Sequence, residues 1–82
     1  MITKLRVGNL PLSATEATLR SKFQQFGTVN SATVVMDALT GRSKRFAFVE
    51  MANASEAVAA IRRLNMSQYD EATISVIAVR DD

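Results

Sequence analysis

The chain has 82 residues, of which 48% are hydrophobic, and it contains one proline, three glycines, no cysteine and no histidine. This composition suits one small folded domain, which we take to span residues 1–82, and does not suit a disordered linker. Without cysteine or histidine there are no disulfides, no thiolate chemistry and no imidazole, so we expect no enzyme, no cofactor and no metal site. The net charge is only +2, and no apolar run is long enough to cross a membrane.

The first predicted elements are a strand over residues 3–8 and a helix that follows a break at Pro11. In the strand, apolar and basic side chains alternate, as they do when one face of a strand is buried. The helix begins after Ser13 or Thr15, and we favour Thr15 because an acidic residue then opens the first turn. It ends at Gly27, and three residues at spacings of four and three form its apolar stripe: Leu19, Phe23 and Phe26.

A β-hairpin is predicted in the middle of the chain. Residues 29–36 are rich in β-branched side chains and form its first strand, and residues 37–43 form a loop in which Gly41 supplies the turn. Residues 44–51 form its second strand, which is the densest aromatic and β-branched run of the sequence. One face of this strand carries Lys44, Phe46, Phe48 and Glu50, and the other carries Arg45, Ala47, Val49 and Met51. Both faces are apolar at the centre, so we expect the strand to lie inside a sheet.

The last third of the chain predicts a second helix and a final strand. Asn53 caps the helix, which runs to about Asn65, where a left-handed Asn ends it. Its inner stripe consists of small and aliphatic residues: Ala57, Ala60, Ile61 and Leu64. Residues 66–72 form a connection that Tyr69 anchors to the core, and residues 73–79 form the last strand.

This order of elements, strand-helix-strand-strand-helix-strand, is that of the α+β ferredoxin-like fold. Right-handed crossovers place both helices on one face of a four-stranded antiparallel sheet. The side chains expected between sheet and helices are Leu5, Val7, Ala32, Val34, Ala47, Val49, Ile74 and Val76. The side chains expected on the open face are Arg6, Thr33, Val35, Phe46, Phe48, Ser75 and Ile77.

The strand over residues 44–51 has two interpretations from its residues alone. Phe is more often a core residue than a ligand contact, but two rings beside cations on an open sheet form a stacking platform for bases. The strand resembles the octapeptide signature of the RNA recognition motif: basic, Gly, aromatic, Gly or Ala, aromatic, aliphatic, any, aromatic. Here Arg45 replaces the Gly and Met51 the last aromatic. Residues 5–10 are similar to the second signature of that family, with Arg6 in place of its aromatic residue.

The resemblance implies a domain that binds single-stranded RNA, and single-stranded DNA more weakly. It implies that a mostly exposed Phe48 stacks under one base, that Phe46 packs against sugars, and that Arg6 stands where a neighbouring base stacks. Arg6 is then either a substitute stacking group or a solvated cation. The other candidate contacts are Lys4, Lys44, Arg42, Thr33, Ile77 and Arg80. Among the cations, Lys4, Arg45 and Arg80 also fit a solvated surface.

Two other functions are open at this point. An exposed apolar face with Phe46, Phe48 and Ile77 suits a protein partner or a second copy of the chain. The loop before the last strand, Asp70-Glu71-Ala72, lacks the Arg-x-Phe signature of peptide-binding relatives. Acylphosphatases share the topology, but residues 9–13 lack the Arg of their phosphate cradle. No signal peptide is apparent, so we expect an intracellular protein, cytoplasmic or, in a eukaryote, nuclear.

Overall fold

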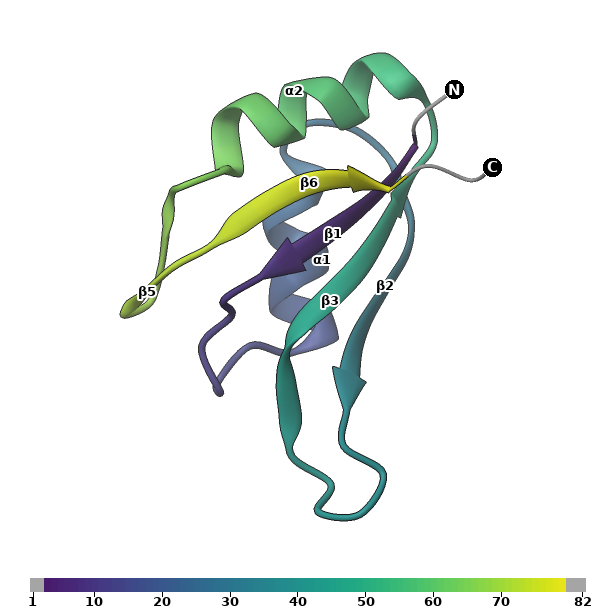
Figure 1. Ribbon diagram of the computed structural model, residues 1–82. Helices are drawn as coiled ribbons and strands as arrows, with labels where there is room; N and C mark the ends of the chain where they lie inside the picture. Colours follow the sequence, from purple (N-terminus) through teal and green to yellow (C-terminus); the bar gives the residue numbers. More distant parts are fainter. Residues whose placement is uncertain (1–2, 80–82) are drawn as a thin grey trace.

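The computed structural model describes residues 3–79 and shows a four-stranded sheet with two helices packed on one of its faces (Figure 1). The strands of this sheet are β1 (Lys4–Gly8), β2 (Val29–Met36), β3 (Ser43–Met51) and β6 (Ser75–Val79), and the helices are α1 (Glu16–Gln24) and α2 (Ala54–Leu64). All neighbouring strands are antiparallel, in the order β2-β3-β1-β6. The fold is therefore the ferredoxin-like α+β arrangement that the element order predicts.

The two middle strands of the sheet, β1 and β3, decide which side chains are buried. Leu5 lies opposite Val49, and Val7 lies opposite Ala47. All four side chains point towards the helices and are completely buried. Because successive side chains of a strand point to opposite faces, burial of this set sends the residues between them to the other face. The alternation thus leaves Arg6, with the residues around it, on the uncovered side of the sheet.

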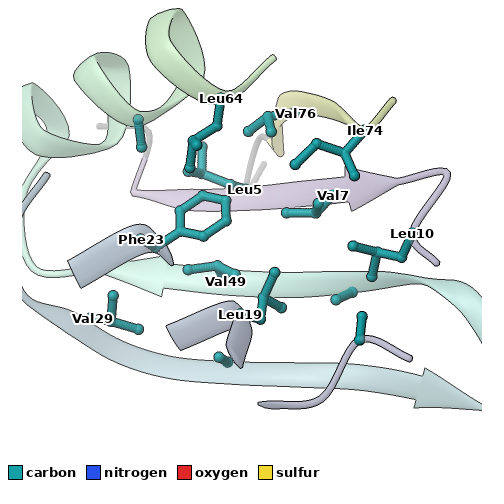
Figure 2. Close-up of a cluster of buried hydrophobic side chains, with 14 of the residues drawn as sticks. Leu5, Val7, Leu10, Leu19, Phe23, Val29, Val49, Leu64, Ile74 and Val76 are labelled. Carbon is teal, nitrogen blue, oxygen red and sulfur yellow. The ribbon is translucent and has the colours of Figure 1, made fainter. Parts of the chain in front are cut away.

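The hydrophobic core fills the space between the sheet and the helices (Figure 2). Leu19 and Phe23 enter it from α1, and Leu64 enters it from α2. Ala57 and Ala60 are also buried, and their small side chains allow α2 to lie close to the strands. Burial of one such large side chain contributes roughly 1.5–3 kcal/mol. Along residues 3–79, neither helix is long and apolar enough to span a membrane.

Both helices begin at the predicted cap residues. The Thr15 hydroxyl accepts the backbone N–H of Thr18 at 3.2 Å, and the Thr18 hydroxyl accepts the N–H of Thr15 at 3.1 Å. The Asn53 side-chain oxygen accepts the N–H of Glu56 at 2.9 Å, and its amide donates to the Glu56 carboxylate at 2.7 Å. Each cap gives a partner to an N–H group that the first helical turn cannot satisfy.

The end of α1 differs from the prediction. The helix ends at Gln24 instead of continuing to Gly27. The reason is a tighter turn, in which the N–H of Phe26 bonds to the carbonyl of Phe23 at 3.0 Å. Phe26 remains packed against the core but is only partly buried.

The end of α2 also differs, because Asn65 is not left-handed. Asn65 is extended, with φ −62° and ψ 129°, and the left-handed residue is Met66, with φ 65°. The Asn65 side-chain oxygen instead accepts the backbone N–H of Val76 at 3.0 Å. This bond joins the end of α2 to β6. The partner, Val76, is eleven positions later in the chain than Asn65.

The segment before the last strand is more regular than predicted. It contains a two-stranded hairpin of β4 (Gln68–Tyr69) and β5 (Ala72–Thr73). Tyr69 anchors this hairpin as predicted, since it is only 3% exposed and its hydroxyl is hydrogen-bonded to that of Thr18. The predicted strand over residues 73–79 is interrupted at Ile74 and continues as β6.

Candidate functional site

One row of side chains crosses the open face of all four strands. Thr33 of β2 lies opposite Phe48 of β3. Phe48 lies opposite Arg6 of β1, which lies opposite Ile77 of β6. Opposite residues of antiparallel strands have their Cβ atoms about 5 Å apart. The sheet therefore brings four of the sequence-predicted site residues into one line.

The two phenyl rings of β3 lie beside each other on this face. The ring centroids of Phe46 and Phe48 are 6.0 Å apart, with an interplanar angle of 89°. This edge-to-face geometry is one that aromatic pairs prefer, because the positive edge of one ring meets the negative face of the other. Both side chains are partly buried, so Phe48 is less exposed than the sequence led us to expect.

Two cations of β1 cover these rings. The Arg6 Cζ atom is 4.7 Å from the centroid of Phe46, and the Lys4 Nζ atom is 5.3 Å from that of Phe48. Both contacts run diagonally across the strand pair, because Arg6 is in register with Phe48 and Lys4 with Glu50. A cation over an exposed ring contributes about 0.5–1 kcal/mol. Both Arg6 and Lys4 are thus in contact with an aromatic ring and are not simply solvated.

Sequence reasoning missed this covering of the rings. The available signal was the equal spacing of the two pairs, since Lys4 and Arg6 are two residues apart, as are Phe46 and Phe48. A pairing of the two strands in the observed register sets each cation beside a ring. Without the register, the same four residues predict no particular contact.

The loop between β2 and β3, which contains Arg42, extends beyond the end of the sheet (Figure 1). The Asp37 carboxylate accepts the backbone N–H groups of Leu39 at 2.8 Å and Thr40 at 3.1 Å, and these bonds lower the pKa of Asp37. Gly41 has the positive φ, 71°, that the predicted turn requires. Arg42 is exposed at the end of this closed loop.

One further predicted contact, Lys44, lies apart from the row and is exposed near the start of β3. Arg80 lies outside the described residues, so its predicted contact has no structural counterpart. Within residues 3–79, no three potential metal-binding side chains of His, Cys, Asp or Glu come together.

Arg45 does not lie on the sheet as a solvated cation. Its φ is 65°, and it lies in the stretch of β3 where the register with β2 shifts, between the pairs Val34/Ala47 and Met36/Ser43. Its side-chain Nε donates to the carbonyl of Leu10 at 2.8 Å, and the N–H of Leu10 donates to the Arg45 carbonyl at 2.9 Å. Asn9, with φ 57°, donates its side-chain amide to the carbonyl of Thr73 at 2.7 Å. These bonds join the segment after β1 to β3 and to β5.

The family model for the RNA recognition motif matches residues 5–75 of the chain. The chain belongs to the RNA recognition motif family. The matched range includes the site row from Arg6 to Phe48, both helices and the β4–β5 hairpin.

Curated relatives of this RNA recognition motif are plant ribonucleoproteins. The 33 kDa ribonucleoprotein, chloroplastic, of Nicotiana sylvestris is 44% identical over 73 residues, which are 89% of this chain and 22% of the relative. The 29 kDa ribonucleoprotein B, chloroplastic, of the same species is 43% identical over 75 residues, which are 92% of this chain and 26% of the relative. The chain thus spans about a quarter of the length of the curated relatives that it matches.

Solved structures of similar chains share the whole fold. The crystal structure of RNA Binding Protein PG1 has a TM-score of 0.93 and 35% identity, and the match covers 98% of this chain and 96% of that one. The Sxl-lethal protein/RNA complex also has a TM-score of 0.93, with 28% identity, and the match covers 100% of this chain and 49% of that one.

The departures of this RNA recognition motif from its signatures have local physical reasons. Arg45 stands where the signature has Gly, and its positive φ is a backbone state that Gly adopts without strain. A left-handed backbone costs a non-glycine residue roughly 1–2 kcal/mol, which the bond from Arg45 to Leu10 partly offsets. Met51 stands where the signature ends in an aromatic, and it is buried in the core, 1% exposed.

Proposed function

We propose that this domain binds single-stranded RNA on the open face of its sheet. The observation that carries the proposal is the row of Thr33, Phe48, Arg6 and Ile77, with Phe46 beside it, on the face that the helices leave uncovered. Membership of the RNA recognition motif family supports it, as does the likeness to ribonucleoproteins and to a domain solved with RNA.

Phe48 is the ring we propose for base stacking. A base in a single strand has an unpaired π face, and base–aromatic stacking contributes about 1–3 kcal/mol. In the free domain the face of this ring is occupied by the ammonium group of Lys4. A base that stacks there displaces Lys4, whose flexible side chain then meets a phosphate. Binding thus exchanges a weak cation–π contact for a stacked base and an ion pair.

Arg6 is the side chain we propose for a second stacked base. Its planar guanidinium lies over Phe46, and the side chain is exposed, so a free side of the group is available to a base. A base that stacks on this free side extends the stack of Phe46 and Arg6 by one layer. Arg6 then replaces the aromatic residue of the family signature without leaving its position, and Phe46 also packs against sugars.

The remaining proposed contacts are electrostatic or depend on the sugar. Lys44, Arg42 and Arg80 attract phosphates, and with a net charge of +2 this attraction is modest. Contacts to the 2′-hydroxyl favour RNA, so we expect weaker binding to single-stranded DNA. A protein partner or a second copy of the chain would compete for the same face, since Ile77 is 50% exposed there.

We propose an intracellular location for this domain. The sequence alone led us to expect the cytoplasm, or the nucleus of a eukaryote. The curated relatives are chloroplast proteins, so we add the plastid to the proposed compartments.

Fluorescence anisotropy with a short unstructured RNA, and with a duplex of the same length, tests the proposal. We expect the single strand to bind more tightly, because the bases of a duplex cannot stack on the sheet. Affinity should fall as salt rises, with a log–log slope of about −0.7 for each phosphate contact. Phe48→Ala should weaken binding of the single strand, whereas Val58→Ala, a truncation at an exposed position of α2, should leave it unchanged. Equal affinity for the two RNAs contradicts binding by base stacking.

A further inference from the structure

A recess lies at the end of the sheet, and the phenyl rings are not part of its lining. It is a partly open cavity of about 680 Å³ between the segment that follows β1, the start of β3 and the β4–β5 hairpin. This volume falls in the range of about 300–1,000 Å³ that is usual for small-ligand sites. Pro11, Leu12 and Ala72 give it apolar walls, and Arg45, Asp70 and Glu71 give it charged groups of both signs.

Left-handed backbone conformations are concentrated around this cavity. Within residues 3–79, four non-glycine residues have positive φ, and three of them line it: Asn9 at 57°, Arg45 at 65° and Asp70 at 54°. A glycine at the position of Arg45 would adopt this backbone without strain. Strained residues that persist in a fold are found preferentially at ligand-binding and active sites. The side chain of Arg45 is therefore a candidate for a binding role that glycine cannot fill.

One hydrogen bond orients the Arg45 guanidinium and leaves its terminal nitrogens available as donors. Its Nε donates to the Leu10 carbonyl at 2.8 Å, which fixes the plane of the group, and the side chain remains exposed at the cavity. The terminal nitrogens form a planar pair of donors. Such a pair suits two adjacent acceptors, as on the O6 and N7 edge of guanine.

The carboxylates of the hairpin add acceptors to the same cavity. Asp70 is oriented by Ser13, whose hydroxyl donates to one carboxylate oxygen at 2.8 Å, and Glu71 is exposed beside it. An ionised carboxylate only accepts hydrogen bonds. It therefore suits the adjacent N1–H and N2–H donors of guanine, whereas the unprotonated N1 of adenine would be repelled.

We propose that this cavity binds a guanine base, with Arg45 at its O6 and N7 and the carboxylates of Asp70 and Glu71 at its N1–H and N2–H groups. Guanine is the natural base with two adjacent acceptors next to two adjacent donors, which is the complement of this set of side chains. The apolar walls contact the faces of the base.

The cavity extends the sheet site along the chain. Arg45 directly precedes Phe46, so their Cα atoms are about 3.8 Å apart and the cavity begins next to a residue of the sheet site. The inference rests on the proposed function, because the sheet supplies most of the RNA affinity. The cavity adds a preference for guanine at one position of the RNA.

The proposal is tested with a set of uridine RNAs in which one uridine at a time is replaced. Short uridine RNAs carry one guanine, or one adenine, at each successive position, and anisotropy measures their affinities. We expect one position at which guanine binds roughly fivefold or more tightly than adenine, the lower end of the discrimination of a bidentate contact. The other positions should show smaller differences, because stacking accepts every base.

Three variants assign the preference to the cavity. Arg45→Lys keeps the charge but loses the planar pair of donors. Asp70→Asn keeps a residue that tolerates a left-handed backbone and an oxygen that can accept from Ser13, and Glu71→Gln removes the other charge. Each should reduce the ratio of guanine to adenine affinity while uridine RNA binds nearly as before. Arg62→Lys, at an exposed position of α2, is the matched control and should keep the ratio.

The outcomes separate this inference from the proposed function. Binding of uridine RNA without a guanine preference at any position overturns the inference and leaves the sheet site in place. A preference that survives Arg45→Lys, Asp70→Asn and Glu71→Gln also overturns it. A second measurement tests the cavity without the sheet: guanosine or adenosine 5′-monophosphate is added to the domain, and the changes in amide chemical shifts are recorded by NMR. Larger changes at the cavity amides with the guanosine nucleotide support the cavity even where uridine RNA does not bind.

Discussion

Phe23 and Phe48 are the same residue type in two different environments. Phe23 is completely buried between α1 and the sheet, whereas Phe48 is partly buried on the open face, beneath Lys4 and beside Phe46. The surroundings of Phe48 are polar, charged or aromatic side chains that can move aside. Those of Phe23 are aliphatic side chains in a closed core.

Truncation of these two rings should therefore have opposite effects. Phe23→Ala leaves a cavity and should cost roughly 3–5 kcal/mol of unfolding free energy, a large share of the total for so small a domain. Phe48→Ala should cost only about 1 kcal/mol, from the lost ring pair and cation contact, but should lose about 1–3 kcal/mol of RNA affinity. Thermal melts and RNA titrations measure both quantities. Unfolding of Phe48→Ala to the same extent as Phe23→Ala would contradict the assignment of this ring to the RNA site.

Substitutions at Arg6 distinguish a stacking group from a charge. Because the guanidinium lies over the ring of Phe46, Arg6→Tyr should keep or improve RNA affinity, and Arg6→Ala should weaken it. Arg6→Lys keeps the charge but loses the plane, so it should bind more weakly than the parent by about 1 kcal/mol. RNA titrations at two salt concentrations measure these differences. Equal affinities of the Lys and Arg forms would remove the case for guanidinium stacking.

At the scale of the elements, the helices support the sheet from the side opposite to the proposed RNA site. α2 depends on its cap, where Asn53 and Glu56 satisfy each other's polar groups at the first turn. Its last turn is joined to β6 through Asn65 and Val76. α2 is thus fixed at both ends, although it contributes no side chain to the open face.

Loss of the Asn53 cap of α2 should change the stability of the domain without changing its RNA affinity. Asn53→Ala should lower the unfolding free energy by about 0.5–2 kcal/mol, because an N–H of the first turn loses its partner. Asn53→Ser keeps a side-chain acceptor and should restore most of it. The RNA affinity of both folded variants should equal that of the parent. Chemical denaturation and RNA titration measure the two effects, and a loss of affinity in folded Asn53→Ala would connect α2 to the RNA site.

At the scale of the whole molecule, the sheet separates two functions between its faces. One face holds the helices over the apolar core (Figures 1 and 2). The other combines aromatic rings with cations. The net charge of +2 is small, so long-range attraction to RNA is modest and the proposed affinity depends on stacking at the rings. The rings and the cavity lie on adjacent parts of the chain.

The sequence by itself determined the order of the elements, the assignment of faces and the helix starts. These features depend on local rules: alternation along a strand, a spacing of three and four along a helix, and caps such as Thr15 and Asn53. The same rules assigned Phe23 to the core and gave the order of elements of the correct fold. They did not decide the environment of Phe48. That side chain was assigned to the open face because right-handed crossovers leave one sheet face uncovered, and because the strand resembles the signature of the RNA recognition motif.

The tertiary structure alone decided which distant residues meet. Arg6 lies over Phe46 and Lys4 over Phe48 because of the register between β1 and β3, which alternation does not specify. Asn65 failed as a predicted left-handed stop because a bond to Val76 holds it extended. Contacts of this kind form between residues far apart in the chain, and their free energies depend on the packing of the whole domain. A local pattern contains no information about them.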